Sequence, residues 1–328
     1  MRYIIYGAGG IGSVLGGHLF RTGCEVVLVG NAAHVEAINA RGLRLVTGDE
    51  PYTLRIPACK HAQALAPFRE DDVVLLCAKS QHTLKCLGQL RNAGAPRSLP
   101  ICCCQNSISN EPLATRVFDA VYGAMIMVPA IFMSPGEVIS PITTRNGFID
   151  IGRYPRGTDA LCETLAGALT CAGFSARAHP EVMKPKGAKC LTNLGNALEA
   201  ITNGQGDENA LMQAVQREAM QVWSAAGIEW EEMDAFRQRA RTRYGVRKVP
   251  AGYEHLTKRG SSWQSLARGT GNIEAEQLNG DVVALGRLLG IATPYNELLW
   301  HIADQMARAH EAPGKYSADD LQHMVQEG

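Results

Sequence analysis

Lys189 and Asn193 lie four residues apart in a segment whose other residues are mostly small or apolar, Gly187-Ala-Lys-Cys-Leu-Thr-Asn193. In an α-helix this spacing places both side chains on one face, about one turn apart. A covered face would desolvate the lysine and lower its pKa, which suits a general acid for a carbonyl oxygen. The alternative is a surface lysine beside an asparagine that packs between helices. Lys184 and Lys186 are nearby competitors for the role of the acid.

The start of the chain carries a pattern that suits a dinucleotide. An apolar run over Tyr3–Tyr6 stops at Gly7, and glycines at 7, 9 and 12 have the spacing G-x-G-x-x-G. Apolar residues then recur at helical intervals from Ile11 to Phe20, so the motif lies between a strand and a helix, where it can bind a pyrophosphate. The predicted cofactor-binding residues of this turn are Gly7, Ala8, Gly9, Gly10, Ile11 and Gly12. A glycine turn without a ligand, and the flavin and methyl-donor variants of the turn, are the alternatives.

Two polar residues follow apolar runs that are typical of strands buried in a parallel sheet. Lys79 comes after Val73–Cys77, and Asn106 comes after Pro100–Cys104. The carboxyl ends of parallel strands meet at the edge of the sheet where ligands bind. Lys79 is therefore predicted to reach the phosphate or ribose of a cofactor, and Asn106 to orient a nicotinamide or a substrate hydroxyl through its amide. A solvated lysine at a helix start and a turn-forming asparagine are the alternatives.

These candidate residues require a sheet that gathers them and a second domain that carries Lys189. Strand patterns dominate up to about Pro180, and long amphipathic helical patterns dominate after it. The sequence therefore predicts an N-terminal α/β domain with a Rossmann-type doubly wound sheet, residues 1–180, followed by an all-α C-terminal domain, residues 181–328. The helical patterns cover Lys189–Ile201, Ala210–Ala226, Glu229–Tyr244, Ile273–Leu289 and Pro294–Ala309, with a polar loop over roughly Gly245–Thr270 between the third and the fourth.

The composition is that of an ordinary globular enzyme and argues against several classes of partner. Lys plus Arg and Asp plus Glu balance at 32 each, so neither nucleic-acid binding nor attraction to an acidic membrane is indicated. The most apolar stretch, Val121–Met133, is too short to span a bilayer. The ten cysteines lack zinc-site spacing and are expected to be buried, reduced thiols, so we expect no metal site and a cytoplasmic protein. The fold is expected to begin at the N-terminus without a signal peptide.

Taken together, these residues resemble the ketopantoate reductase (2-dehydropantoate 2-reductase) family over nearly the whole chain. No single segment is specific, and it is their order and spacing that carry the resemblance. The matching segments are Gly7–Gly12, Ala78–Ser80, Gln105–Asn106, Lys189–Asn193, Ser261–Trp263, Ile273–Glu274, Asn279–Gly280 and Gly290–Asn296.

The resemblance implies that a hydride passes from the nicotinamide of NADPH to the ketone carbon of a small-molecule 2-oxo acid, such as 2-dehydropantoate. It implies Lys189 and Glu274 as the catalytic residues. Lys189 would polarise the ketone and protonate the alkoxide, while Glu274 would bind the substrate hydroxyl and help keep Lys189 charged. The implied substrate-binding residues are Asn106, Asn193, Ser262 and Glu274. From the residues alone, Glu274 also suits a helix N-terminus, and Ser262 a simple turn.

One departure from the family pattern bears on the choice of cofactor. The family usually has an arginine for the 2′-phosphate after the second strand, where Asn31 stands in this chain. Asn31 stays a candidate cofactor residue, and His34 and Arg41 are candidate substitutes for the missing arginine. NADP(H) is therefore implied by the resemblance alone, and NAD(H) stays open because no acidic residue takes the same place.

Other departures bear on the substrate. Ser107 stands where the family has glycine, Ala197 where it often has asparagine, and Leu266 where it often has aspartate. If the turn at Ser107 needs a positive φ, a serine there costs on the order of 1 kcal/mol. Several of these positions should line the substrate site, so we expect the true substrate to be a 2-oxo acid that can differ from ketopantoate.

Two other functions compete with this interpretation. One is another NAD(P)-dependent dehydrogenase of the hydroxyacid or opine type, with the same order of domains. The other is a cofactor-binding sensor without turnover, which would need no proton donor such as Lys189. The apolar helical faces of the C-terminal half can also form a homodimer interface, although amphipathic spacing does not separate an interface from a core.

Overall fold

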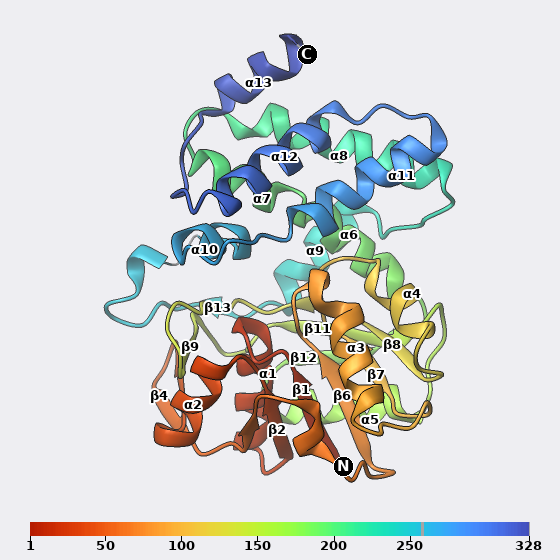
Figure 1. Ribbon diagram of the computed structural model, residues 1–328, viewed down its shortest axis with the longest axis vertical. Coiled ribbons are helices and arrows are strands. Elements are labelled where there is room, and N and C mark those ends of the chain that lie inside the picture. Colours follow the sequence, from red (N-terminus) through yellow and green to blue (C-terminus); the bar gives the residue numbers. More distant parts are fainter. Residues whose placement is uncertain (257–258, 328) are drawn as a thin grey trace. The chain divides into compact units, whose positions relative to one another are not determined.

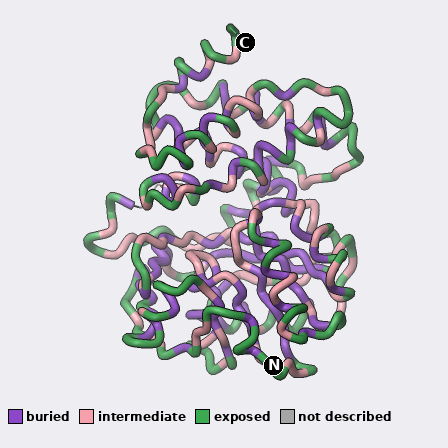
Figure 2. Tube along the Cα trace, viewed as in Figure 1, coloured by how far each residue is buried: buried purple, intermediate pink, exposed green. Residues whose placement is uncertain are grey.

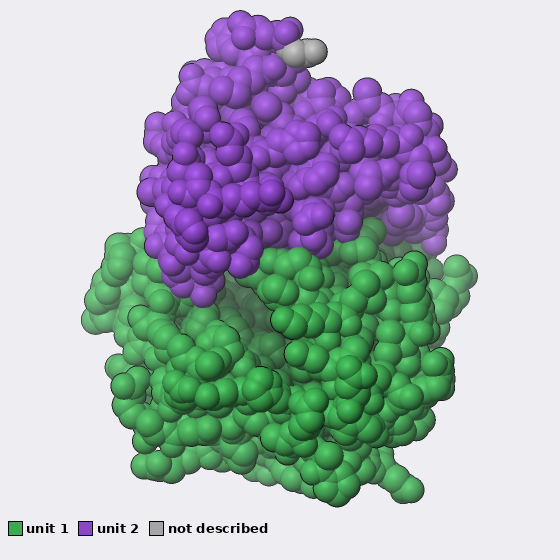
Figure 3. Space-filling view, viewed as in Figure 1, with its two compact units in different colours: residues 1–186, 231–257 green, residues 187–230, 258–328 purple. Residues whose placement is uncertain are grey.

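The computed structural model describes residues 1–256 and 259–327. The chain forms two compact units (Figure 3): unit 1 comprises residues 1–186 and 231–257, and unit 2 comprises residues 187–230 and 258–328. This division differs from the single boundary predicted at residue 180. The chain enters unit 2 six residues later than predicted, and residues 231–257 return to unit 1.

Unit 1 is built on an eight-stranded sheet with the order β12-β11-β8-β7-β6-β1-β2-β5 (Figure 1). All neighbouring strands are parallel except β8 and β11, which run antiparallel. The chain starts in β1 and builds outward to both sides, so the carboxyl ends of β1, β2, β6 and β7 share one edge. The strands are β1 (Arg2–Tyr6), β2 (Glu25–Val29), β5 (Ala58–Cys59), β6 (Asp72–Leu76), β7 (Ile101–Cys103), β8 (Val121–Met127), β11 (Phe148–Arg153) and β12 (Ser175–Ala178).

The sheet is buried on both faces, as its continuous apolar strands predict. Tyr3 and Ile5 of β1 point into one core and Ile4 and Tyr6 into the other, because successive side chains of a strand alternate between faces. Figure 2 shows the central strands as buried along their length. Helices α1 (Gly10–Arg21) and α5 (Ala160–Cys171) supply the first core, and α3 (Thr83–Asn92) and α4 (Asn110–Thr115) the second.

Three strands predicted from the sequence lie outside the large sheet. A separate sheet has the order β4-β3-β9, and its inner residues Leu43, Leu45 and Val138 join the core on the α1 side. A two-stranded sheet pairs β10 with β13. Periodicity predicts that a segment is a strand but not which sheet it joins. The bounds are β3 (Leu43–Thr47), β4 (Pro51–Leu54), β9 (Glu137–Ser140), β10 (Ile142–Thr143) and β13 (Val246–Arg247).

A buried ion cluster explains why residues 231–257 belong to unit 1. Helix α9 (Met233–Arg243) presents Arg239 and Arg243 to the carboxylate of Asp150 in β11, which is completely buried. Arg177 of β12 donates to the same carboxylate over 2.9 Å. Burial alone would raise the pKa of Asp150, but the three guanidinium groups outweigh it and lower the pKa. The amphipathic spacing of α9 predicted the helix but not its ion pairs with Asp150.

Unit 2 is helical, as predicted. Helix α6 (Met183–Asn193) begins in unit 1 and continues into unit 2, where α7 (Gly195–Thr202) follows after a break at Leu194. The sequence predicted one helix across that break. The remaining helical segments are α8 (Glu208–Ala225), α10 (Ser261–Ala267), the π-helical η4 (Glu276–Gly280), α11 (Asp281–Leu289), α12 (Pro294–Arg308) and α13 (Ala318–Glu327).

Two parts of the sequence prediction for this half of the chain were incomplete. The loop predicted over residues 245–270 contains β13, the 3-10 segment η3 (Glu254–Leu256) and α10, and its residues 257 and 258 lie outside the described part. Helix α13 was not predicted. Across the described ranges, no helix is long and apolar enough to cross a membrane.

Candidate functional site

The glycine turn connects β1 to α1 as the motif predicts. Gly7 has a φ of +108°, and a Cβ added there would lie 2.2 Å from the amide nitrogen of Ala78. A Cβ on Gly12 would lie 2.3 Å from the carbonyl oxygen of Gly7. Both glycines are therefore required by the protein itself, Gly7 for a backbone conformation that strains other residues and Gly12 for the close approach of α1 to the strand end.

Gly9 is different, because no described neighbour requires its lack of a side chain. Its φ of −97° suits any residue, and a Cβ added to it meets no atom of the described residues within 4 Å. Gly9 is the N-cap of α1, so the N–H groups in the first turn of the helix have no partners inside the helix. An open glycine beside free N–H groups and the positive end of a helix fits a pyrophosphate.

This geometry predicts that a side chain added at Gly9 weakens cofactor binding without destabilising the fold. Gly9→Val should change the free energy of unfolding by less than about 1 kcal/mol, since the new side chain enters open space, but should weaken NADPH binding at least tenfold by occupying the phosphate site. Thermal melting and fluorescence titration with NADPH measure the two effects. Gly88→Val is the matched control, because Gly88 lies in α3 and also has no atom within 4 Å of an added Cβ. Unchanged binding in Gly9→Val would contradict this assignment of the turn.

Lys79 and Asn106 lie where the sequence placed them, in the loops that follow β6 and β7, and both are half-buried. A buried polar network fixes the two loops that carry them. Gln105 Nε2 donates to Thr83 Oγ1 over 2.7 Å, and Thr83 Oγ1 donates to Asn110 Oδ1 over 2.7 Å. Asn110 Nδ2 donates in turn to Ser80 Oγ and to the Ser107 carbonyl oxygen, each over 3.2 Å. Sequence reasoning missed this network; its only signal was the run of small polar residues after each buried strand.

The condition under which Ser107 would be strained, a positive φ, is not met. Ser107 is not among the described residues with a positive φ, and its hydroxyl lies 2.7 Å from that of Ser109. The serine therefore replaces the family's glycine without a backbone cost, because its turn stays in the ordinary φ range.

The region after β2 corrects one suggestion about the 2′-phosphate. Asn31 is exposed and is the N-cap of α2 (Ala32–Arg41), with its Oδ1 accepting from His34 N over 2.9 Å. His34 is completely buried; its Nδ1 accepts from Gly136 N, which leaves Nε2–H to donate to Ser13 Oγ. Burial lowers the pKa of His34 to about 4. A buried, neutral histidine cannot serve as the phosphate-binding cation.

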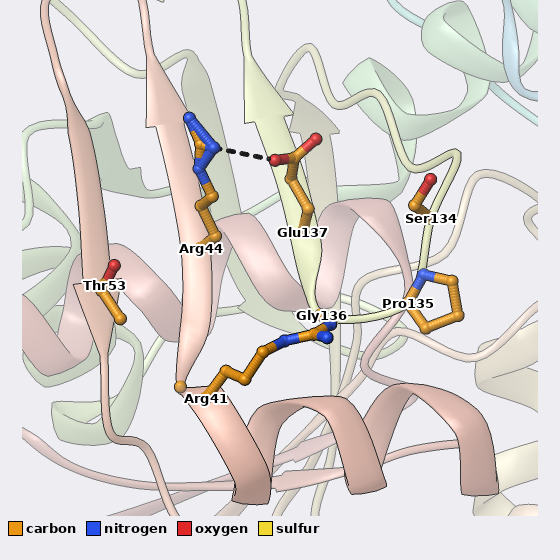
Figure 4. Close-up of a pocket in the computed structure, with 8 residues that line it drawn as sticks. Arg41, Arg44, Thr53, Ser134, Pro135, Gly136 and Glu137 are labelled. Carbon is orange, nitrogen blue, oxygen red and sulfur yellow. Dashed lines mark hydrogen bonds and ion pairs between the residues drawn. The ribbon is translucent and has the colours of Figure 1, made fainter.

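Arg41 is also an unsuitable substitute for the family's arginine. It ends α2, about 15 Å along the helix from the N-cap at Asn31, given the 1.5 Å rise per residue. Arg41 instead lines a pocket of about 440 Å³ whose wall carries the Arg44–Glu137 ion pair (Figure 4). The pocket is lined by Arg41, Gly42, Arg44, Thr53, Ser134, Pro135, Gly136 and Glu137.

In unit 2, Lys189 and Asn193 form the pair that their spacing predicts. Lys189 Nζ donates to Asn193 Oδ1 over 2.8 Å, within α6. Lys189 is half-buried as a residue, and desolvation of its ammonium lowers the pKa from 10.5 to about 8. Asn193 is buried, and its Nδ2 has no hydrogen-bond partner among the described residues. A buried amide donor without a partner is costly, so this atom is suited to binding a ligand oxygen.

Ser262 lies in α10, a helix rather than the simple turn that was the alternative, and is buried. Glu199 of α7 holds the start of this helix, because both of its carboxylate oxygens accept from Gly260 N, over 3.1 and 3.0 Å. Asn196 Nδ2 lies 3.5 Å from Ser261 Oγ. Asn196 and Glu199 thus tie α7 to the segment that carries Ser262, a role that the sequence did not reveal.

Glu274 is half-buried in the turn before η4. Asn279 of η4 connects this region to the end of α6, since its Nδ2 donates to the Leu194 carbonyl oxygen over 3.2 Å. Asn279 Nδ2 also lies 3.1 Å from Asn296 Oδ1, and both asparagines are completely buried. Asn279 and Asn296, which belong to the last two segments that match the family pattern, therefore have a structural role inside unit 2.

Two of the departures from the family pattern are also inside unit 2, where Ala197 and Leu266 are buried. Within this unit Lys189 and Asn193 are hydrogen-bonded to each other, while Ser262 and Glu274 come from separate elements. Among the residues that the structure describes, no group of three or more His, Cys, Asp or Glu side chains could hold a metal ion.

One buried ion pair that sequence reasoning missed lies in unit 1, at the start of α6. Lys186 is 1% exposed and pairs with Glu111 of α4, which is 0% exposed. Lys186 Nζ also donates to the Cys103 carbonyl oxygen of β7 over 2.8 Å. The sequence indicated Lys186 only as an alternative general acid. Its ammonium instead forms the ion pair with Glu111.

Comparison with known proteins finds two family models that match successive parts of the chain. Residues 3–156 match the family model described as ketopantoate reductase PanE/ApbA, and residues 186–307 match the model of its C-terminal part. The chain belongs to the ketopantoate reductase family. The resemblance stated from the sequence is confirmed, and with it the predicted fold class. The family consists of NADP-dependent oxidoreductases, so the chain is assigned to that class of enzyme.

Individual relatives cover nearly the whole chain. A 2-dehydropantoate 2-reductase of Pyrococcus abyssi is 27% identical over 92% of this chain and 96% of its own length. The structure of a PanE/ApbA family ketopantoate reductase from Ralstonia eutropha JMP134 has a TM-score of 0.78 at 28% identity, covering 94% of this chain and 99% of that one. A D-mandelate dehydrogenase in complex with NADH has a TM-score of 0.76 at 20% identity, covering 95% of this chain and 100% of that one, which shows the shared fold alone.

Proposed function

We propose that this protein reduces the ketone of a 2-oxo acid to a 2-hydroxy acid with NADPH, with 2-dehydropantoate or a related oxo acid as the substrate. The reaction consumes one NADPH and one proton and yields NADP⁺. The cofactor, when bound, supplies the hydride. Family membership and the relatives named 2-dehydropantoate 2-reductase support the reaction class. The open phosphate site at Gly9 supports cofactor binding by unit 1.

The residues of the chain have separate tasks in this proposal. The Lys189 ammonium donates a hydrogen bond to the ketone oxygen, stabilises the negative charge that develops there and then transfers its proton to it. Asn193 orients the ammonium through Oδ1 and offers Nδ2–H to a substrate oxygen. Ser262 and Glu274 bind the polar groups of the substrate, and Lys79 and Asn106 bind the cofactor at the ends of β6 and β7.

A single observation carries the role of Lys189. Its ammonium is held 2.8 Å from Asn193 Oδ1, and desolvation lowers its pKa to about 8. A proton donor works best when its pKa lies near the working pH, because it is then charged yet releases its proton readily. An ordinary surface lysine, with a pKa near 10.4, would be a much weaker acid.

The function is tested by oxidation of NADPH and NADH, followed through the absorbance of the reduced nicotinamide, with ketopantoate and a panel of small, branched and aromatic 2-oxo acids. Turnover with any of them supports the proposal, and the order of the rates names the substrate. Turnover only with imines formed from an oxo acid and an amine would favour the opine type of dehydrogenase. Cofactor binding without any turnover would favour a sensor.

We also propose that the protein is cytoplasmic and forms a homodimer through unit 2. All ten cysteines are free thiols, which suits a reducing compartment. Leu288 and Leu289 of α11 are 83% and 41% exposed, and neighbouring apolar side chains of this kind suit an interface. Light scattering after gel filtration measures the mass, and a monomer would contradict the dimer.

A further inference from the structure

We infer that Lys60 is a residue that selects NADPH over NADH, in place of the arginine that the family usually carries after β2. The inference rests on the proposed function, because it assumes that unit 1 binds the dinucleotide at the glycine turn. In such folds the group that reads the ribose 2′ position follows the second strand, about 20 residues after the glycine motif. In this chain that place is Gly30-Asn31, which carries no charge.

The sheet brings Lys60 to this place from a different part of the sequence. β5 runs parallel to β2 with Val29 opposite Cys59, and Gly30 N donates to the Cys59 carbonyl oxygen over 3.2 Å. Lys60 directly follows the last residue of β5, Cys59, and therefore comes next to Gly30 at the carboxyl edge of the sheet. No spacing rule along the sequence connects residues 31 and 60, which is why the sequence did not indicate it.

The ion pair of Lys60 shows where its ammonium lies. Lys60 Nζ is 2.5 Å from Glu36 Oε1. Glu36 lies one turn beyond Ala32 and Ala33 on the same face of α2, and helical side chains lean toward the helix N-terminus. The ammonium is thus held near the first turn of α2, where the backbone N–H groups and the helix dipole also favour an anion.

The other cations of this region are less suitable. His34 is buried and neutral, and the guanidinium of Arg41, whose backbone ends α2, lies beside Gly136 in the pocket of Figure 4. The side chain of Lys60 is 40% exposed, so it can meet a 2′-phosphate. Glu36 competes with that phosphate for the ammonium, which predicts that the two partners of this ion pair have opposite effects on NADPH binding.

The test measures equilibrium binding of NADPH and of NADH separately, by fluorescence titration without substrate. Lys60→Ala should weaken NADPH binding about tenfold and leave NADH binding within about twofold, since one charge-assisted contact to the phosphate is lost. Glu36→Gln should strengthen NADPH binding about threefold by releasing the ammonium. Lys60→Arg should retain the preference. Lys248→Ala is the matched control, because Lys248 forms an exposed ion pair with Asp49 in the same unit and should leave both affinities unchanged.

The outcomes separate this inference from the function on which it rests. A wild-type protein that binds neither cofactor would overturn both. Binding of both cofactors with an affinity ratio that Lys60→Ala leaves unchanged would overturn the role of Lys60 alone. If Lys60→Ala weakens the binding of NADPH and of NADH equally, the ion pair only supports the fold and the role of Lys60 is overturned. The same conclusion follows if Lys60→Ala and Glu36→Gln both weaken NADPH binding.

Discussion

Lys189→Ala is expected to lower kcat/KM for the 2-oxo acid about a thousandfold while leaving the affinity for NADPH unchanged. Removing a general acid typically costs a factor of 10² to 10⁴, and in the proposed mechanism Lys189 also stabilises the developing alkoxide. The ammonium donates to Asn193 within α6, and Lys189 is not part of the glycine turn that is proposed to bind the cofactor. Steady-state kinetics with the substrate and a separate NADPH titration measure the two quantities.

The pH dependence gives the same prediction a second, independent readout. Desolvation lowers the pKa of Lys189 from 10.5 to about 8, and the reductive reaction needs the protonated form. The wild-type rate of reduction should therefore be constant below about pH 8 and fall tenfold per pH unit above it. Oxidation of the hydroxy acid, which needs the neutral amine, should rise over the same range. Lys189→Ala should lose this titration in both directions.

Lys184→Ala is the matched control for Lys189. Lys184 lies in the same helix and pairs with Glu181 over 2.8 Å, in an exposed ion pair of the kind that contributes little to stability. Its loss should change the rate by less than about twofold. If the Lys184 variant loses as much activity as the Lys189 variant, or if the Lys189 variant keeps its activity, Lys189 is not the general acid.

Lys186→Met is expected to destabilise unit 1 by about 3–5 kcal/mol, because it leaves the Glu111 carboxylate buried without its ammonium. Both side chains are almost completely covered, and Lys186 Nζ also satisfies the Cys103 carbonyl oxygen. Burial already raises the pKa of Glu111, and without the ammonium of Lys186, which lowers it, that pKa would rise further. Urea unfolding followed by circular dichroism gives the free energy of unfolding.

A double variant distinguishes a buried ion pair from simple overpacking. Replacing both partners, as Lys186→Met with Glu111→Leu, should restore much of the stability, because two apolar side chains leave no charge to bury. Asp119→Asn is the surface control; it breaks the exposed pair with Arg97 and should cost less than about 1 kcal/mol. Losses in the two single variants that simply add in the double variant would contradict the coupling.

The sequence predicted the parts of this protein whose signals are local. The turn at Gly7, the strand ends at Lys79 and Asn106, and the pairing of Lys189 with Asn193 all follow from spacing within a few residues. The return of α9 to unit 1 did not, because it depends on Asp150 meeting arginines about ninety residues away.

The same reason explains the details of the site that were missed. Glu199 and Gly260, or Lys60 and Gly30, are brought together by packing and strand order, and neither pair has a periodic signature. His34 was a candidate cation because histidine can carry a charge, but only the structure shows that both of its ring nitrogens are already in use inside the protein. Burial and hydrogen-bond partners therefore exclude His34 from the candidate cations for the 2′-phosphate that the sequence suggested.

The most direct test of the central claim is transfer of deuterium from NADPH labelled at C4 of the nicotinamide to the product. The protein is incubated with each of the two C4 stereoisomers of labelled NADPH and with the best 2-oxo acid of the panel, and the product is analysed by mass spectrometry. The account predicts a 2-hydroxy acid that carries deuterium at C2 with one stereoisomer and none with the other. A product without deuterium from either stereoisomer, or bound cofactor without any product, would contradict it.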